Sequence, residues 1–347
     1  MTFKKLLVLI CVVAVLLIFA FAKKTIRQKE IARQEAQEKL SVCVLTKDLA
    51  GSFIAKILVY KGSDENNKLS ISKDKEGNWI LERKFGIRAK KEKIDKLLKE
   101  LGDLKGEIRA ASGDLFGDFQ IKDNQGVHII FEADGGKVLK HLVVSFLVAG
   151  RDKNFVRLAA GQEVVLVAKN ILEHFNLFDK ESKLDETFLA DLKLFSFTPK
   201  QIQKIELSAG ESFVLKKSQP EGASGPAWNF EPAKTLADEA DTAKVDEFLR
   251  DVSGLYAKDV LDPGLNTYGF DQPALRIVLE DAQAKIAAEV ELGSYLEKEK
   301  LHYVRVLPAN FVYKVSDTYI QKINKGRQFF LKPQEKENPA KNKESKK

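Results

Sequence analysis

A stretch of twelve residues that occurs twice, at Lys93–Leu104 and Lys244–Leu255, constrains the fold of this chain more than any other feature. In both copies the apolar residues recur at steps of 3, 4, 7 and 10, which places five side chains on one face of an α-helix. We therefore expect two amphipathic helices that pack against a core, with Leu98 and Leu249 equally buried. The apolar positions are Ile94, Leu97, Leu98, Leu101 and Leu104, and then Val245, Phe248, Leu249, Val252 and Leu255.

The similarity between the two halves extends beyond the helices. Each helix follows a tryptophan, Trp79 or Trp228, and precedes a strand-like run with a common pattern, NFVRL at Asn154–Leu158 and HYVRV at His302–Val306. The offset between the copies is 151 residues at the helix and 148 at this strand. An offset that drifts so little indicates a duplicated unit.

The sequence predicts an α+β fold for each unit, with a mostly antiparallel sheet covered by one main helix. We place the first repeat at residues 41–185 and the second at 186–330. Runs of β-branched and aromatic residues, bounded by turn residues, predict the strands. They are 57–60, 69–72, 79–81, 127–131, 142–148, 155–158 and 164–167, and then 202–207, 212–215, 228–230, 275–279, 286–292, 303–307 and 311–315.

The first 40 residues are expected to be a membrane anchor and a helical stalk. Leu6–Ala22 carries no charge and is flanked by lysines, which is typical of a signal-anchor that remains as a transmembrane helix. A cleaved signal peptide is the alternative, because Ala20-Phe21-Ala22 has the form of a cleavage site, and a buried soluble helix is a third reading. Residues 23–40 lack Gly and Pro and favour a polar helix.

The charge of the chain does not indicate nucleic-acid binding. The formal net charge is +7, but the basic excess lies at the two ends, and residues 41–330 carry about −1. The last segment, 331–347, is rich in Lys, Glu, Asn and Pro and is expected to be a disordered basic tail. Two cysteines at separate sites, Cys11 and Cys43, cannot stabilise a core through disulfides.

We found no pattern of residues that predicts catalysis, a cofactor or a metal site. The four histidines lack the spacing of metal ligands, and each is interpreted as structural or exposed. No GxSxG, Walker A or GxGxxG motif occurs. Trp79 and Trp228 could stack on a ligand, but a tryptophan before an amphipathic helix more often anchors a core. We therefore expect no enzymatic activity.

The second unit resembles the bacterial family catalogued as domain of unknown function 4340. The resemblance is carried by Trp228, the helix, the loop Tyr268–Pro273 (YGFDQP), and the strand Tyr303-Val304-Arg305. In the first unit it is carried by Trp79, the helix and Phe155-Val156-Arg157, with Phe116-Gly117-Asp118-Phe119 as a degraded copy of the loop. The residues that it marks as structural or as possible interaction residues are Trp79, Trp228, Tyr268, Gly269, Pro273, Arg157 and Arg305.

The resemblance implies a single-pass protein of the inner membrane whose bulk is extracytoplasmic. The Lys and Arg residues that follow Leu6–Ala22 would by themselves favour a cytoplasmic C-terminus, so this placement rests on the family alone. The expected function is that of a non-enzymatic accessory protein in a cell-envelope transport assembly, of the ABC-type export or gliding type. Its partners would be the cytoplasmic membrane and permease components. The alternative is an envelope glycan- or ligand-binding protein that uses a groove between the units.

Overall fold

The computed structural model describes residues 23–24, 27–28, 42–46, 49, 53–102, 104–148, 152–218, 226–232 and 239–332. Most of the expected stalk, the apolar run 6–22 and the tail beyond Lys332 lie outside these residues. Within the described part of the chain, no helix combines the length and the apolar character needed to cross a bilayer. The anchor therefore stays a prediction.

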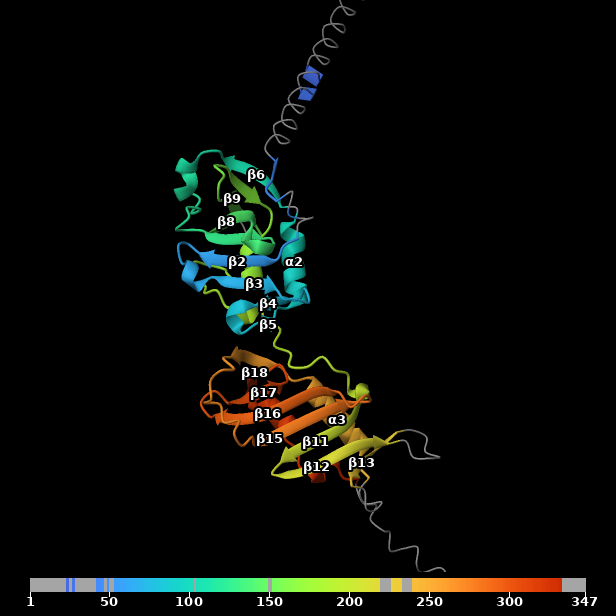
Figure 1. Ribbon diagram of the computed structural model, residues 1–347. Helices are drawn as coiled ribbons and strands as arrows, with labels where there is room; N and C mark the ends of the chain where they lie inside the picture. The colour runs from blue at the N-terminus through green and yellow to red at the C-terminus, as the bar shows by residue number, and fades with distance from the viewer. Residues whose placement is uncertain are drawn as a thin grey trace, which may run out of the picture. The chain divides into compact units, whose positions relative to one another are not determined.

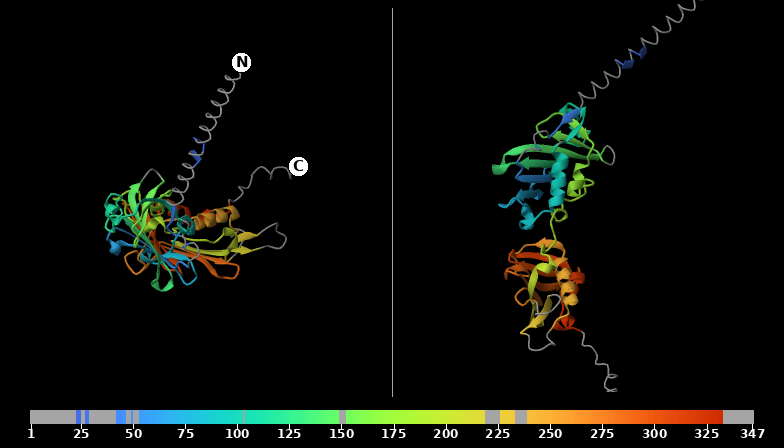
Figure 2. Two further views of the ribbon diagram at one scale, coloured as in Figure 1. Left: turned by 90° about the horizontal axis from the view of Figure 1, so that it is seen from above. Right: turned by 90° about the vertical axis from the view of Figure 1, so that its right-hand side faces the viewer.

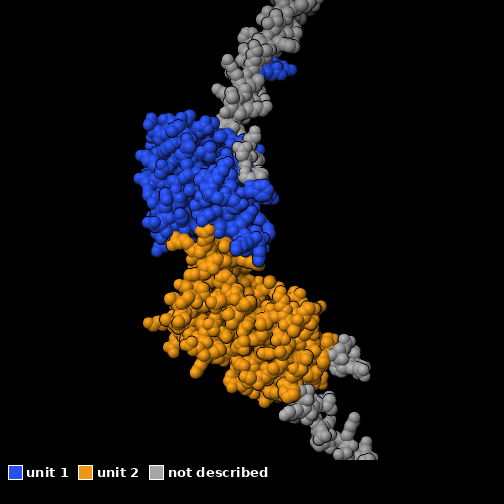
Figure 3. All heavy atoms as spheres, in the orientation of Figure 1, with its two compact units in different colours: residues 1–79, 90–188 blue, residues 80–89, 189–347 orange. Residues whose placement is uncertain are grey.

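The chain divides into two compact units, one of residues 1–79 and 90–188 and the other of residues 80–89 and 189–347 (Figure 3). The chain forms two sheets, and Figure 1 labels many of their strands and the principal helix beside each. Neighbouring strands pair antiparallel, for example β2 (Lys56–Lys61) with β7 (Val127–Glu132) and β11 (Ile202–Ala209) with β15 (Leu275–Asp281). The prediction of mostly antiparallel sheets with helices is confirmed.

The first sheet has ten strands in the order β1-β6-β10-β9-β8-β7-β2-β3-β4-β5. Besides β2 and β7, its strands are β1 (Val42–Val44), β3 (Leu69–Lys73), β4 (Trp79–Leu81), β5 (Ile87–Arg88), β6 (Lys105–Ala110), β8 (Val138–Val148), β9 (Asn154–Leu158) and β10 (Val164–Val167).

The second sheet has eight strands in the order β13-β12-β11-β15-β16-β17-β18-β14. Its remaining strands are β12 (Glu211–Ser218), β13 (Ala227–Glu231), β14 (Ala257–Leu261), β16 (Ile286–Leu296), β17 (Leu301–Leu307) and β18 (Phe311–Ser316). The same order is found in the first sheet from β4 to β6, where β4, β3, β2, β7, β8, β9, β10 and β6 occupy the matching places. The duplication that the sequence predicts is therefore also a duplication of topology.

One helix in each unit lies along one face of the sheet, α2 (Lys91–Leu101) in the first and α3 (Thr242–Ser253) in the second (Figures 1 and 2). The helix α3 buries Val245, Phe248, Leu249 and Val252, and it begins at Asp241, whose carboxylate accepts hydrogen bonds from the N–H groups of Ala243 and Lys244. A shorter helix, α4 (Asp317–Ile323), packs beside α3. These helices cover the apolar face of each sheet, and burial of that face supplies the core.

The structure corrects several details of the sequence reading. Leu98 is only half-buried, whereas Leu249 is fully buried, because α2 buries Ile94, Leu97 and Leu101 alone along its length. The strands β1, β5, β6 and β14 and the helix α4 were not predicted. A 3₁₀ helix, Ile171–Phe175, follows β10.

Candidate functional site

The loop before β15 is held against β16 by its backbone. The carbonyl of Tyr268 accepts a hydrogen bond from the N–H of Ser294 at 2.8 Å, and the Tyr268 hydroxyl donates to the carbonyl of Asp262 at 3.0 Å. Gly269 has a φ of +78°, and a Cβ there would lie 2.3 Å from Ser294 Oγ. The glycine is therefore required both by the left-handed backbone and by the close approach of β16.

The first unit contains the same loop three residues later than the sequence match places it. The ring of Phe119 lies 4.8 Å from that of Phe155 at an interplanar angle of 61°, and Tyr268 lies 4.8 Å from Tyr303 at 59°. The carbonyl of Phe119 accepts a hydrogen bond from Ser145 Oγ at 2.6 Å, as the carbonyl of Tyr268 accepts one from β16. The counterpart of 268–270 is thus 119–121, and the assignment to Phe116-Gly117-Asp118-Phe119 is wrong.

The glycine of the loop is the reason that this correspondence is hidden in the sequence. Gln120 occupies the place of Gly269 and has a φ of +53°, so the first unit keeps the left-handed turn without a glycine. A pattern search for aromatic-Gly then finds Phe116-Gly117, which lies in a neighbouring 3₁₀ helix, Gly113–Gly117.

In the second unit, Arg305 and its neighbours form a charge network across three strands. The register places Arg276 of β15 opposite Glu291 of β16, and Glu291 opposite Arg305 of β17. Arg305 Nε donates to Glu291 Oε2 at 2.7 Å, and its Nη2 lies 2.5 Å from the same oxygen. Arg276 Nη2 donates to Glu289 at 2.6 Å, so two arginines and two largely buried glutamates balance one another.

The guanidinium of Arg305 also stacks on the ring of Phe270, with 4.6 Å between its central carbon and the ring centroid. Together they line a hollow of about 230 Å³, to which Asn266, Tyr268, Asp271 and Asn310 also contribute. Within the described residues Arg305 Nη1 has no hydrogen-bond partner, and the Arg305 side chain is 30% exposed. We refer to this cavity as the Arg305 hollow. It presents donors and acceptors, of which Arg305 is held in place by Glu291 and Phe270.

The equivalent arginine of the first unit, Arg157, is buried. Arg157 is 2% exposed, and its guanidinium group stacks on the ring of Phe116, with 4.6 Å between its central carbon and the ring centroid. Its Nε donates to the carbonyl of Ile121 at 2.9 Å, and its Nη1 donates to those of Leu158 and Ala159 at 3.2 and 2.8 Å. Its Nη2 is paired with the carboxylate of Asp123. Each of its nitrogens is used, so Arg157 holds the loop rather than facing a hollow.

A model of one protein family, described as a domain of unknown function (DUF4340), matches residues 79–272. The chain belongs to this family. The matched segment begins at Trp79, passes through α2 and α3, and ends in the loop before β15. No curated protein and no solved structure matches the chain.

The remaining residues that the DUF4340 resemblance marks lie elsewhere in the fold. Trp79 and Trp228 are 8% and 1% exposed, and the Nζ atoms of Lys73 and Lys217 lie 4.9 and 5.8 Å from their ring centroids. Both rings therefore pack into the cores of their units. Pro273 is half-buried and follows the loop directly, but it does not line the Arg305 hollow. The structure thus brings together Tyr268, Gly269 and Arg305 and separates them from the tryptophans.

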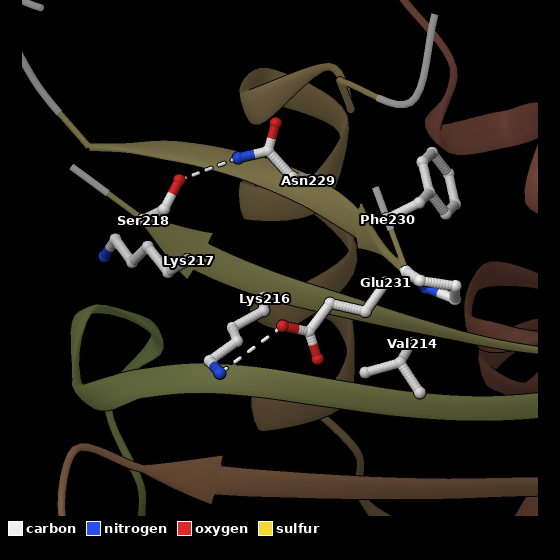
Figure 4. Close-up of a pocket in the computed structure, with 8 residues that line it drawn as sticks. Val214, Lys216, Lys217, Ser218, Asn229, Phe230 and Glu231 are labelled. Atoms are coloured by element: carbon white, nitrogen blue, oxygen red, sulfur yellow. Dashed lines mark hydrogen bonds and ion pairs between the residues drawn. The ribbon is translucent and has the colours of Figure 1, made fainter. Parts of the chain in front are cut away.

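A larger hollow, of about 750 Å³, lies beside β12 and β13 (Figure 4). Its polar side chains are largely paired with each other. Lys216 and Glu231 form an ion pair at 3.3 Å, and the amide of Asn229 donates to Ser218 Oγ at 2.7 Å. These pairs satisfy the groups that a polar ligand would need, so this hollow is a weaker candidate than the Arg305 hollow.

Two histidines of the first unit form a pair that the sequence analysis missed. His128 Nε2 lies 2.8 Å from the carbonyl oxygen of Asp123, which can only accept, so this nitrogen carries a proton. His128 Nδ1 lies 2.8 Å from His141 Nε2, and in the neutral pair His141 is the donor. The ring of Tyr60 stacks on His128 at 4.5 Å. The register of the hairpin could have predicted this pair, because it places residues 128 and 141 diagonally across β7 and β8.

The environment of the pair changes the acidity of His141. Burial lowers the pKa of His141 below its ordinary value, and the charges of His128 and Arg157 lower it further. In the part of the chain that the structure describes, no group of three or more His, Cys, Asp or Glu side chains is arranged to hold a metal ion. The pair therefore reads as a buried hydrogen-bonded link between β7 and β8.

Proposed function

We propose that this chain is a membrane-anchored, extracytoplasmic, non-enzymatic accessory protein of a bacterial envelope transport assembly, of the ABC-type export or gliding type. The observation that supports an interaction role is the Arg305 hollow. It holds an arginine that Glu291 and Phe270 fix in place and whose Nη1 has no hydrogen-bond partner among the described residues. Fixed polar groups of this kind lose little conformational freedom when a partner docks.

The size of the hollow favours a protein partner over a small substrate. Small-molecule sites usually enclose about 300–1,000 Å³, whereas the Arg305 hollow encloses about 230 Å³. It suits one or two side chains of a larger partner. Leu265, which is 52% exposed, lies on its lining and provides an apolar contact for such a partner.

A photo-crosslinking amino acid tests the docking surface directly. Placed at Leu265 in cells, it should capture a permease component, and placed at Ile286 it should not. Ile286 is 45% exposed and lies in the same unit outside the hollow, so it is a matched control. Arg305→Gln should weaken the crosslink at Leu265. Equal capture at both positions, or capture unaffected by Arg305→Gln, would remove the hollow from the proposal.

The topology is tested separately by fusions after residue 330. We expect an active alkaline phosphatase fusion and an inactive β-galactosidase fusion, because residues 41–347 are proposed to lie outside the cytoplasmic membrane. Labelling of the Cys43 thiol from outside the membrane would be a less direct test. Cys43 is half-buried, and burial and Glu163 raise the pKa of its thiol. An active β-galactosidase fusion would place these residues in the cytoplasm.

A glycan- or ligand-binding role is the second candidate, and the mixed lining of the hollow favours it. Asn266 and Asn310 can donate and accept, and Asp271 accepts beside the donor Arg305, which suits the hydroxyls of a sugar. A screen of envelope oligosaccharides against the wild type and Arg305→Gln distinguishes the two roles. Saturable binding of a sugar that the variant loses would favour the second role over docking to a permease.

A further inference from the structure

A third hollow in the second unit, distinct from the Arg305 hollow and from the hollow beside β12 and β13, lies against Trp228. It encloses about 630 Å³, which is within the range of about 300–1,000 Å³ typical of small-molecule sites. Pro199, Pro226 and Trp228 supply apolar lining. We refer to it as the Trp228 hollow, and its size sets it apart from a contact for a single side chain.

The cations that line this hollow have no ion-pair partner in the part of the chain that the structure describes. Lys200, Lys217 and Arg250 line it, and none of them has an ion-pair partner within the described residues. Lys204 and Lys216, by comparison, are paired with carboxylates on the same sheet. Asp246 is the acidic residue on the lining, so the lining carries an excess of two positive charges.

A buried donor at the same place also lacks a partner. Trp228 is 1% exposed, and its Nε1–H is buried without a hydrogen bond among the described residues. A buried N–H without an acceptor is costly and uncommon in folded proteins. The Nζ of Lys217 lies over the same ring, 5.8 Å from its centroid.

From the size of the Trp228 hollow, its apolar lining and its excess of positive charge, we infer that it binds an organic anion, a small molecule with an apolar body and a phosphate, sulfonate or carboxylate group. The apolar body lies against Pro199, Pro226 and Trp228, and the anionic group is bound by Lys200, Lys217 and Arg250. An inorganic anion would leave the apolar lining in water, and a neutral aromatic molecule would leave the cations unpaired. Both parts of the ligand are therefore needed.

The test uses the intact chain in nanodiscs of phosphatidylcholine, with phenyl phosphate as the probe. The chain has two tryptophans and hence two indole N–H signals in a ¹H–¹⁵N spectrum, which Trp79→Phe assigns. Phenyl phosphate should move the Trp228 signal and leave the Trp79 signal in place, which also reports that the first unit is folded. Phenol and inorganic phosphate should each require at least about tenfold higher concentration, because each supplies one part of the ligand.

Variants of exposed, unpaired residues complete the test. Lys200→Gln and Arg250→Gln should each weaken binding of phenyl phosphate about three- to tenfold. Lys244→Gln is the matched control, because Lys244 is a cation of α3 that is already paired with Glu247 and does not line the hollow. An unmoved Trp228 signal, an equal response to phenol, or equal weakening by Lys244→Gln would overturn the proposal.

Discussion

The two units share a strand order and a principal helix, but the equivalent arginine is buried in the first unit and partly exposed in the second. In the second unit Arg305 faces Glu291 in register and borders a hollow, whereas in the first unit Arg157 faces Val143. Without a carboxylate on the neighbouring strand, Arg157 donates to three carbonyls and to Asp123 and is sealed. The comparison teaches that the arginine belongs to the framework of the repeat, and that the carboxylate beside it decides whether part of it stays available.

The largest difference between the units should appear in the helices. Leu249→Ala removes three carbons from a fully buried site and should destabilise the second unit by about 2–5 kcal/mol. Leu98→Ala should cost only about 1 kcal/mol, since Leu98 is half-buried. The exposed controls Lys99→Ala and Arg250→Ala should change stability by no more than about 0.5 kcal/mol. Hydrogen exchange in the intact chain resolves the two units, and equal losses for both leucines would contradict the comparison.

The second-largest difference in stability between the units is expected at the two equivalent arginines, Arg157 and Arg305. Arg157→Met leaves the carbonyls of Ile121, Leu158 and Ala159 without their donor and should destabilise the first unit by about 2–3 kcal/mol. Arg305→Met should cost less than about 1 kcal/mol, because the Arg305 side chain is 30% exposed and Glu291 keeps Arg276 within 3.8 Å. Exchange protection of β9 and β17 reports each effect. Similar losses in the two strands would show that Arg305 is as structural as Arg157.

The left-handed position of the loop gives a smaller contrast. Gly269→Ala adds a Cβ at a φ of +78° and close to Ser294 Oγ, and should cost about 1–2 kcal/mol. Gln120→Gly at the matching place relieves the same conformation and should change stability by less than about 0.5 kcal/mol. Denaturant titration of hydrogen exchange in β16 and β8 measures both. A neutral Gly269→Ala would mean that the two loops are equally tolerant.

The smallest expected contrast is in pH dependence. The pKa of His141 is lower in the folded chain than in the unfolded chain, chiefly because of burial. Above about pH 6.5 His141 is neutral in both states, and its titration costs the folded state no stability. Stability of the first unit should therefore fall as the pH drops below that value and the unfolded chain gains a proton. In the matching place the second unit has Glu289, paired with Arg276.

Hydrogen exchange between pH 7.5 and 5.5, corrected for intrinsic rates, measures this difference between the units. His141→Gln keeps a donor toward His128 Nδ1 but cannot titrate, so its first unit should show a flatter pH profile. An unchanged profile in this variant would assign the pH dependence to other groups.

Much of this fold follows from the sequence, because packing imposes periodic patterns. The two helices and the apolar central strands, such as Val127–Glu132, were predicted from apolar spacing. The strands β6 and β14 were missed, since KGEIRA contains few apolar residues and the apolar residues of AKDVL are interrupted by Lys and Asp without alternation. Local patterns do not reveal strands that are defined mainly by the neighbour they pair with.

The candidate site was predictable in its residues and not in its arrangement. Tyr268, Gly269 and Arg305 were marked by the family resemblance, but their partner Glu291 was not, because cross-strand pairs depend on register. The first-unit loop was misplaced because Gln120 adopts a conformation that usually marks glycine. The Trp228 hollow depends on residues from four separate segments, whose meeting no local pattern encodes.

The position of β14 has a consequence for the order in which the second unit forms. This strand follows α3 directly in the chain, yet its partner in the sheet is β18, the last strand, which ends at Ser316. During synthesis from the N-terminus, β14 emerges well before its partner β18 and has no strand to pair with. The last pairing step of the sheet therefore waits for the C-terminal end of the unit, which couples folding of the second unit to completed synthesis of that end. A chain that ends at Leu307 would carry β14 as an unpaired strand, open to association with other chains.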